Sequence, residues 1–146
     1  MSNRMKCGPS GGIDGDDFLD APPPDDVRIT AIHVWHGSWI DAIQIHWSDS
    51  KASPKHGGDG GENKEDIFLA DDEHLVGIYG KYGEKVDSIG FVTNKRVIEP
   101  LGGDGGDVEF HYNAAKSPLT NIDIVGFCGR AGDYIYAIGC IFSVEK

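Results

Sequence analysis

The stretch Gly37-Ser38-Trp39-Ile40-Asp41-Ala42-Ile43 decides the fold, because the chain repeats its pattern twice more. The second copy reads Gly83-Glu84-Lys85-Val86-Asp87-Ser88-Ile89, and the third reads Gly132-Asp133-Tyr134-Ile135-Tyr136-Ala137-Ile138. The leading glycines lie 46 and 49 residues apart. A period of this length predicts a domain built from three equivalent units. One position breaks the pattern, since Tyr136 stands where the first two copies carry an aspartate.

A second motif, G-x-x-G-G, alternates with the first. Its three copies are Gly8-Pro9-Ser10-Gly11-Gly12, Gly57-Gly58-Asp59-Gly60-Gly61 and Gly102-Gly103-Asp104-Gly105-Gly106. A single glycine-rich string is weak evidence for any structure. Two motifs that each occur three times in alternation predict internal symmetry.

Composition and charge restrict the class of protein. A chain of 146 residues fits one domain, and its 21 glycines and 7 prolines predict many turns and little helix. The formal charge of −11 disfavours nucleic-acid partners, whose binding depends on cationic side chains.

No stretch approaches the roughly 20 apolar residues of a membrane span. The segment 1–9 lacks an apolar run, so we expect synthesis in the cytosol without a secretory signal. Cys128 and Cys140 lie in apolar runs and are predicted to be buried.

Alternating apolar residues predict an all-β protein of ten to twelve short strands. Ile43, Ile45 and Trp47 alternate with polar residues, as in a sheet with one buried face. Other predicted strands lie within 27–35, 67–69, 75–79, 89–93, 108–112, 122–127 and 138–144, and turn clusters lie within 14–26, 48–61, 94–106 and 113–118. Three sheets of about four strands, packed as the faces of a prism, explain the repeat. A sandwich does not explain the period, and a three-bladed propeller is hard to close.

The chemistry of the two motifs points to a neutral ligand. Asp41 has the same strand parity as Ile43 and Ile45, which places it on the core side directly after a turn. A carboxylate at such a rim either caps the turn or accepts hydrogen bonds from a ligand. Glycine-rich loops bring backbone N–H groups close to a ligand. Donors beside a carboxylate acceptor suit a polyhydroxylated molecule such as a sugar.

From about Gly8 to Val144 the chain resembles the jacalin-related lectins. The resemblance lies in the segments 37–43, 56–61, 86–94 and 132–139. It implies a single domain over 1–146, with 1–7 as an N-terminal extension. The implied fold is the β-prism I, in which three Greek-key-like four-stranded sheets follow a pseudo-three-fold symmetry. The implied function is reversible carbohydrate binding without a metal, a cofactor or catalysis.

The resemblance also implies three sugar sites, each formed where a G-x-x-x-D loop meets a G-x-x-G-G loop. In the family the aspartate accepts hydrogen bonds from two sugar hydroxyls, and backbone N–H groups of both loops contact sugar oxygens. The implied sets are Ser38, Trp39 and Asp41 with Gly61; Glu84, Lys85 and Asp87 with Gly106; and Asp133, Tyr134 and Tyr136 with Gly12. A phenol offers fewer acceptor positions than a carboxylate, so we expect the Tyr136 site to be weak or silent.

Sugar class follows from the resemblance alone. Galactose-preferring members are cleaved to free a glycine amino group at the glycine-rich loop, whereas residues 1–7 precede Gly8 here. The chain therefore resembles the mannose/glucose branch. We expect glycan partners, no membrane insertion, and a homodimer or higher oligomer that gains avidity.

Two other interpretations stay open. In the first, the chain is a prism-fold interaction or structural module whose sugar sites have partly decayed, as Tyr136 suggests. In the second, the acidic run 14–20 is a calcium loop, although it lacks the spacing of an EF-hand and reads more simply as a solvated loop. Catalysis on a glycan would need a marked pair of carboxylates, and none stands out.

Overall fold

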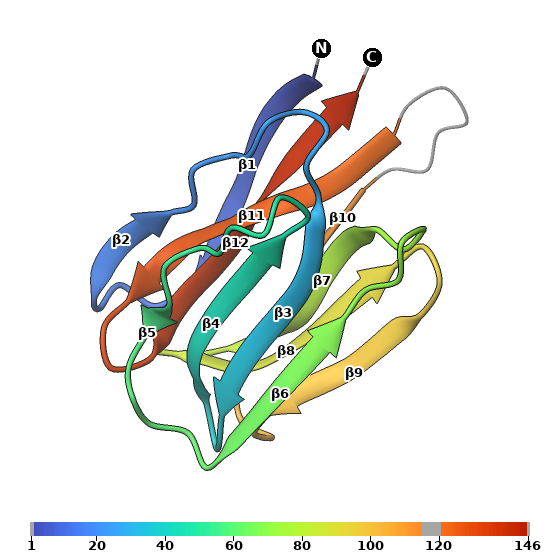
Figure 1. Ribbon diagram of the computed structural model, residues 1–146. Helices are drawn as coiled ribbons and strands as arrows, with labels where there is room; N and C mark the ends of the chain where they lie inside the picture. Colours follow the sequence, from blue (N-terminus) through green and yellow to red (C-terminus); the bar gives the residue numbers. More distant parts are fainter. Residues whose placement is uncertain (1, 115–120, 146) are drawn as a thin grey trace.

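The computed structural model describes residues 2–114 and 121–145, which form twelve strands in three four-stranded antiparallel sheets (Figure 1). The sheets enclose one common core, and this prism confirms the predicted fold class. Within the described ranges no helix is long and apolar enough to cross a membrane.

Each sheet uses the same order of strands, with two central strands flanked by two outer ones. The first sheet has the order β1 (Ser2–Gly11), β12 (Ile135–Glu145), β11 (Asn121–Ala131) and β2 (Asp16–Leu19). The second has the order β5 (His56–Gly57), β4 (Ile40–Trp47), β3 (Ile29–His36) and β6 (Asn63–Phe68). The third has the order β10 (Val108–Asn113), β7 (Leu75–Tyr82), β8 (Val86–Thr93) and β9 (Val97–Gly102).

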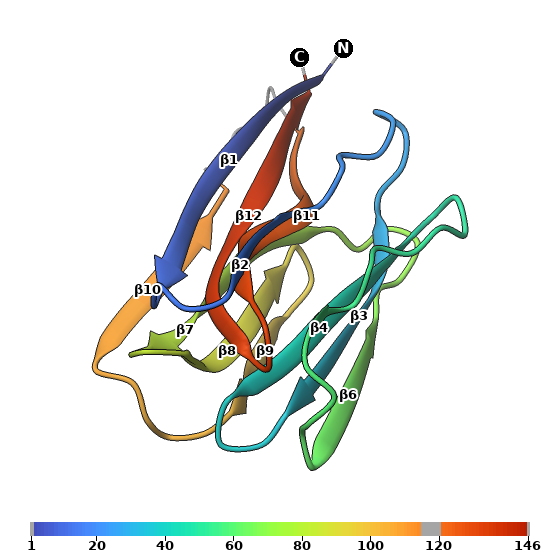
Figure 2. The same cartoon turned by 90° about the vertical axis from the view of Figure 1, so that its left-hand side faces the viewer.

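This topology brings the two sequence motifs together in every sheet. The central strands form the hairpins β3–β4, β7–β8 and β11–β12, and each hairpin tip carries one copy of the first motif. A glycine-rich loop joins the two outer strands of the same sheet, from β5 to β6, from β9 to β10 and from β1 to β2. Each loop therefore has to pass over the tip of its own hairpin, and these loops lie at the end of the prism away from the chain termini (Figure 2).

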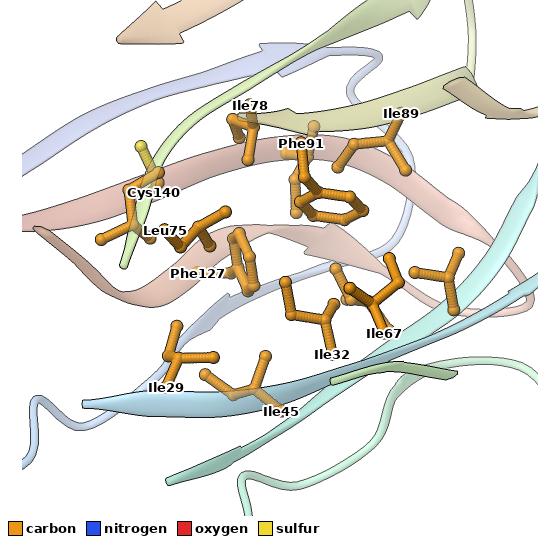
Figure 3. Close-up of a cluster of buried hydrophobic side chains, with 14 of the residues drawn as sticks. Ile29, Ile32, Ile45, Ile67, Leu75, Ile78, Ile89, Phe91, Phe127 and Cys140 are labelled. Atoms are coloured by element: carbon orange, nitrogen blue, oxygen red, sulfur yellow. The ribbon is translucent and has the colours of Figure 1, made fainter. Parts of the chain in front are cut away.

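The inward side chains of the central strands fill the space between the sheets (Figure 3). Ile32 and Ile45 come from the second sheet, Phe91 from the third and Phe127 from the first, and each is at most 1% exposed. The rings of Phe91 and Phe127 meet edge to face with centroids 6.4 Å apart, which links two sheets directly. Cys128 and Cys140 are completely buried, as predicted. This burial raises the pKa of the Cys128 thiol to about 11.

The outer strands are the part of the fold that the sequence pattern missed. Strands β2, β5 and β9 lie inside segments that were predicted as turns, and β1 was not predicted at all. The segment 1–7 was expected to be an extension of the domain. Instead, Ser2–Cys7 is the first half of β1, which pairs with β12 from Ser2 opposite Glu145 to Gly11 opposite Ala137. Outer strands are held by backbone pairing to one neighbour, so they need little apolar alternation.

Candidate functional site

A β-bulge stands just inside the tip of each hairpin, and the variable motif position is the extra residue in all three. In the second sheet Trp35 pairs with Ala42 and His36 pairs with Ile40, which leaves Asp41 without a partner. The same shift leaves Asp87 unpaired in the third sheet and Tyr136 in the first. Bulges redirect a side chain and are frequent beside functional sites. Here the bulge turns Asp41 and Asp87 inward at the rim, where they are 6% and 7% exposed.

The glycine-rich loop is fixed to the bulge by one backbone hydrogen bond that recurs in every sheet. The N–H of Gly58 donates to the carbonyl of Asp41 at 3.0 Å, and the N–H of Gly103 donates to the carbonyl of Asp87 at 2.9 Å. In the first sheet the N–H of Gly12 donates to the carbonyl of Tyr136 at 2.8 Å. Gly12 is thus the structural equivalent of Gly58 and Gly103.

This equivalence changes the pairing that the sequence suggested for the third site. The G-x-x-G-G alignment matched Gly12 with Gly61 and Gly106, but the residue in that place is Gly15. Gly15, Gly61 and Gly106 share a positive φ, at +79°, +99° and +97° respectively. The pattern G-G-x-x-G, which starts at Gly11, Gly57 and Gly102, carried the correct signal, because its spacings of 46 and 45 residues are nearly equal.

The predicted partners of the first two sites do come together. A methyl group on Gly60 would lie 2.7 Å from Oδ2 of Asp41, and one on Gly61 would lie 3.3 Å from Oδ1. In the third sheet a methyl group on Gly105 would lie 2.6 Å from Oδ2 of Asp87. Only glycine lets the loop backbone approach the carboxylate so closely. Each aspartate therefore lies beside a backbone surface without side chains, in two independent copies.

Burial raises the pKa of both aspartates above the ordinary value, and nearby groups partly oppose this effect. For Asp41 the opposing group is His36. For Asp87 a backbone hydrogen bond from Gly83, the charge of Lys85 and a hydrogen bond from the Trp39 side chain lower the pKa, whereas Asp107 raises it.

The third site has changed at two positions together. The ring of Tyr136 lies between the two loops, because a methyl group on Gly15 would be 2.8 Å from its Cδ2 and one on Gly132 would be 3.3 Å from its Cε2. Asp14 occupies the place that Gly60 and Gly105 hold in the other loops. Where the carboxylate is missing, the glycine that made room for it is missing as well.

The residues that follow each tip glycine occupy equivalent positions. Ser38, Glu84 and Asp133 are exposed. The next residues in each tip, Trp39, Lys85 and Tyr134, meet where the three sheets converge. We call these three side chains the tip cluster. Nothing in the sequence alone indicated that they touch.

Within 2–114 and 121–145, no group of three or more His, Cys, Asp or Glu residues is arranged to hold a metal ion. The acidic loop considered for calcium is held by Arg130. Its Nη2 donates to the carbonyl of Gly15 at 2.6 Å, and its Nη1 contacts Asp17 at 2.7 Å. The run 14–17 thus acts as a salt-bridged loop.

Comparison with known proteins agrees with this geometry. Residues 7–141 match the family model of the jacalin-like lectin domain. The chain is 36% identical to an agglutinin of Castanea crenata over 90% of its own length, and it spans 44% of that protein. It is 32% identical to horcolin of Hordeum vulgare over 95% of its length, and it spans 97% of that protein. The structure of a mannose-binding jacalin-related lectin from Ananas comosus superimposes with a TM-score of 0.79 at 29% identity, covering 95% of this chain and 96% of that one.

The chain therefore belongs to the jacalin-related lectins, a family of carbohydrate-binding proteins without catalytic activity.

Proposed function

We propose that this lectin binds neutral glycans of the mannose/glucose type through two sites, one at Asp41 and one at Asp87. The observation that carries the proposal is the repeated geometry, in which a buried carboxylate on a bulge lies against a glycine of the loop above it. Such a carboxylate accepts hydrogen bonds from two hydroxyls of one ligand, and hydrogen bonds to a charged acceptor are worth about 1.5–3 kcal/mol each.

Charge supports a neutral ligand. The net charge of −11 and the exposed carboxylates of Glu84, Asp104 and Asp133 at the loops repel sialylated or sulfated glycans. The similar pineapple lectin is described as mannose-binding, which favours a hexose of this class.

We expect the Tyr136 site to contribute little. Its ring occupies the space between Gly15 and Gly132, whereas Gly61 and Gly106 lie against a carboxylate in the other two sites. Losing one charged hydrogen bond would reduce affinity by roughly one to two decades.

Titration calorimetry with methyl α-mannoside tests the proposal. The native chain should bind about two sugars per protomer, Asp41→Ala and Asp87→Ala should each bind one, and the double variant should bind none. Glu65→Ala, an exposed change on β6, is the control and should behave as the native chain. An unchanged stoichiometry in the double variant would exclude these two sites. No response to any sugar on a glycan array would favour the interaction module instead.

We also propose that the lectin acts as a homo-oligomer. Weak single sites gain up to several decades in avidity when they are linked, and sedimentation of the purified protein measures the assembly.

A further inference from the structure

The tip cluster joins three repeats in one set of contacts. The rings of Trp39 and Tyr134 meet edge to face at 5.6 Å. The Lys85 ammonium lies 4.5 Å from the centroid of the Trp39 ring and 5.1 Å from that of Tyr134. A cation at this distance from two rings holds both of them in place. The position of Trp39 is therefore fixed by side chains from the other two hairpins.

The hairpin tips are interlocked in a cyclic order. A methyl group on Gly103, in the loop above Asp87, would lie 2.2 Å from the carbonyl oxygen of Ser38. The tip of the β3–β4 hairpin thus borders the site of the next sheet as well as its own. Gly58 makes the same approach to Asp133, and Gly12 makes it to Glu84. Every site is consequently flanked by a tip from a different repeat.

Trp39 shows most directly that a tip borders the site of another sheet. Its backbone belongs to the tip above Asp41, yet Trp39 lines one pocket together with Asp87. A pocket of about 490 Å³ lies along this seam between repeats. It is lined by Asp87, Gly103, Asp104 and Gly105 from the third sheet and by Gly37, Ser38, Trp39, Glu62 and Asn63 from the second.

We infer that Trp39 determines the specificity of the Asp87 site, where its indole contacts the second sugar of an oligosaccharide whose first sugar is bound by Asp87. This inference rests on the proposed function. The exposed Glu62 and Asn63 also line this pocket, so it has polar groups besides Asp87 for a ligand longer than one ring. Trp39 is 36% exposed and offers an apolar surface against which the C–H face of a sugar can pack. Burying about 50 Å² of such a face corresponds to nearly tenfold in affinity.

The test uses Asp41→Ala as the parent, so that sugar binding reports the Asp87 site. Calorimetry compares methyl α-mannoside with mannotriose for the parent and for the parent with Trp39→Ala or Trp39→Phe. In the parent the trisaccharide should bind better than the monosaccharide. Trp39→Ala should weaken mannotriose about tenfold and the monosaccharide less than threefold. Trp39→Phe keeps a ring and should retain most of the preference. Trp35→Ala, a tryptophan on the outer face of β3, is the matched control and should change neither affinity.

Two results would overturn the inference, and they are distinguishable. If the Asp41→Ala parent binds methyl α-mannoside but Trp39→Ala leaves the mannotriose preference intact, Trp39 has no role in specificity while the Asp87 site stands. If the parent binds no sugar, the Asp87 site itself is refuted and the inference falls with it. Circular dichroism melting of each variant confirms that a loss of binding is not a loss of fold.

Discussion

Because Gly60 lies so close to the Asp41 carboxylate, adding one methyl group at Gly60 should weaken sugar binding and leave the fold intact. In Gly60→Ala the added carbon would lie 2.7 Å from Oδ2 and 3.7 Å from Cγ of Asp41, and it would meet no other heavy atom within 4 Å. Ordinary contacts of this kind begin at 3.4 Å, so the carboxylate oxygen has to move by about 0.7 Å, the difference between 3.4 and 2.7 Å.

That displacement is enough to lose a ligand. A hydroxyl–carboxylate hydrogen bond spans about 2.5–3.0 Å, and lengthening it by 0.7 Å removes most of its strength. With about 1.5–3 kcal/mol at stake for each charged hydrogen bond, affinity should fall by one to two decades. The free energy of unfolding should change by less than about 0.5 kcal/mol, because only the end of one side chain is disturbed.

The assay is calorimetry with methyl α-mannoside in an Asp87→Ala background, together with thermal melting. Asp59→Ala, one position earlier in the same loop and fully exposed, should leave binding unchanged. Gly58→Ala offers the opposite contrast, since its methyl group would lie 2.2 Å from the backbone oxygen of Asp133 and should destabilise the fold. Native affinity in Gly60→Ala would refute the role assigned to the Asp41 carboxylate.

Three further predictions follow from the same geometry. Burial raises the pKa of Asp41 and Asp87, and sugar binding needs the ionised carboxylate. Affinity should therefore be full above the raised pKa and fall as the pH drops through it, which calorimetry at several pH values would show. An affinity that stays constant down to the ordinary pKa range of aspartate would contradict this. Tyr136→Asp combined with Asp14→Gly should raise the stoichiometry by one sugar per protomer, and an unchanged value would mean that Tyr136 is not what blocks the third site. Burial acts to raise the pKa of the Glu73 carboxyl, but hydrogen bonds from Arg96 and Thr93 help to outweigh it, and the pKa is lowered to about 2. This lowered pKa means that Glu73 stabilises the fold above the ordinary glutamate pKa and that the stabilisation is lost as the pH falls towards 2. Glu73→Gln should therefore reduce the free energy of unfolding by about 1–3 kcal/mol at pH 7 and flatten its acid dependence, as urea melts at several pH values would show.

The central hairpins could be predicted from sequence because their strands bury one face. Ile43, Ile45 and Trp47 alternate with polar residues, and burial of that face produces the period-two pattern. Strands such as β5, with only His56 and Gly57, leave no such pattern, because they depend on pairing with a central strand. Their existence follows from the three-dimensional sheet and not from local composition.

The candidate site divides in the same way. Asp41 and Asp87 were identified because motif and strand parity agree, and the structure shows both at the buried rim. The partner of Tyr136 was placed at Gly12 because the G-x-x-G-G alignment matched glycine identity, whereas the backbone hydrogen bond fixes the register and makes Gly15 the equivalent residue. The contact of Trp39 with a neighbouring site depends on how repeats face one another, which a period along the chain does not specify.

Pairing of β1 with β12 makes one face of the prism out of two segments that lie far apart in the sequence. Ser2 pairs with Glu145 and Gly11 pairs with Ala137, so this face forms only when the two segments meet. Gly12, directly after β1, packs against Glu84 at the tip of the β7–β8 hairpin. The pairing of β1 therefore also holds the loop that carries Gly12 in place. Disrupting the pairing of Ser2 with Glu145, at the other end of β1, would loosen this loop from a distance.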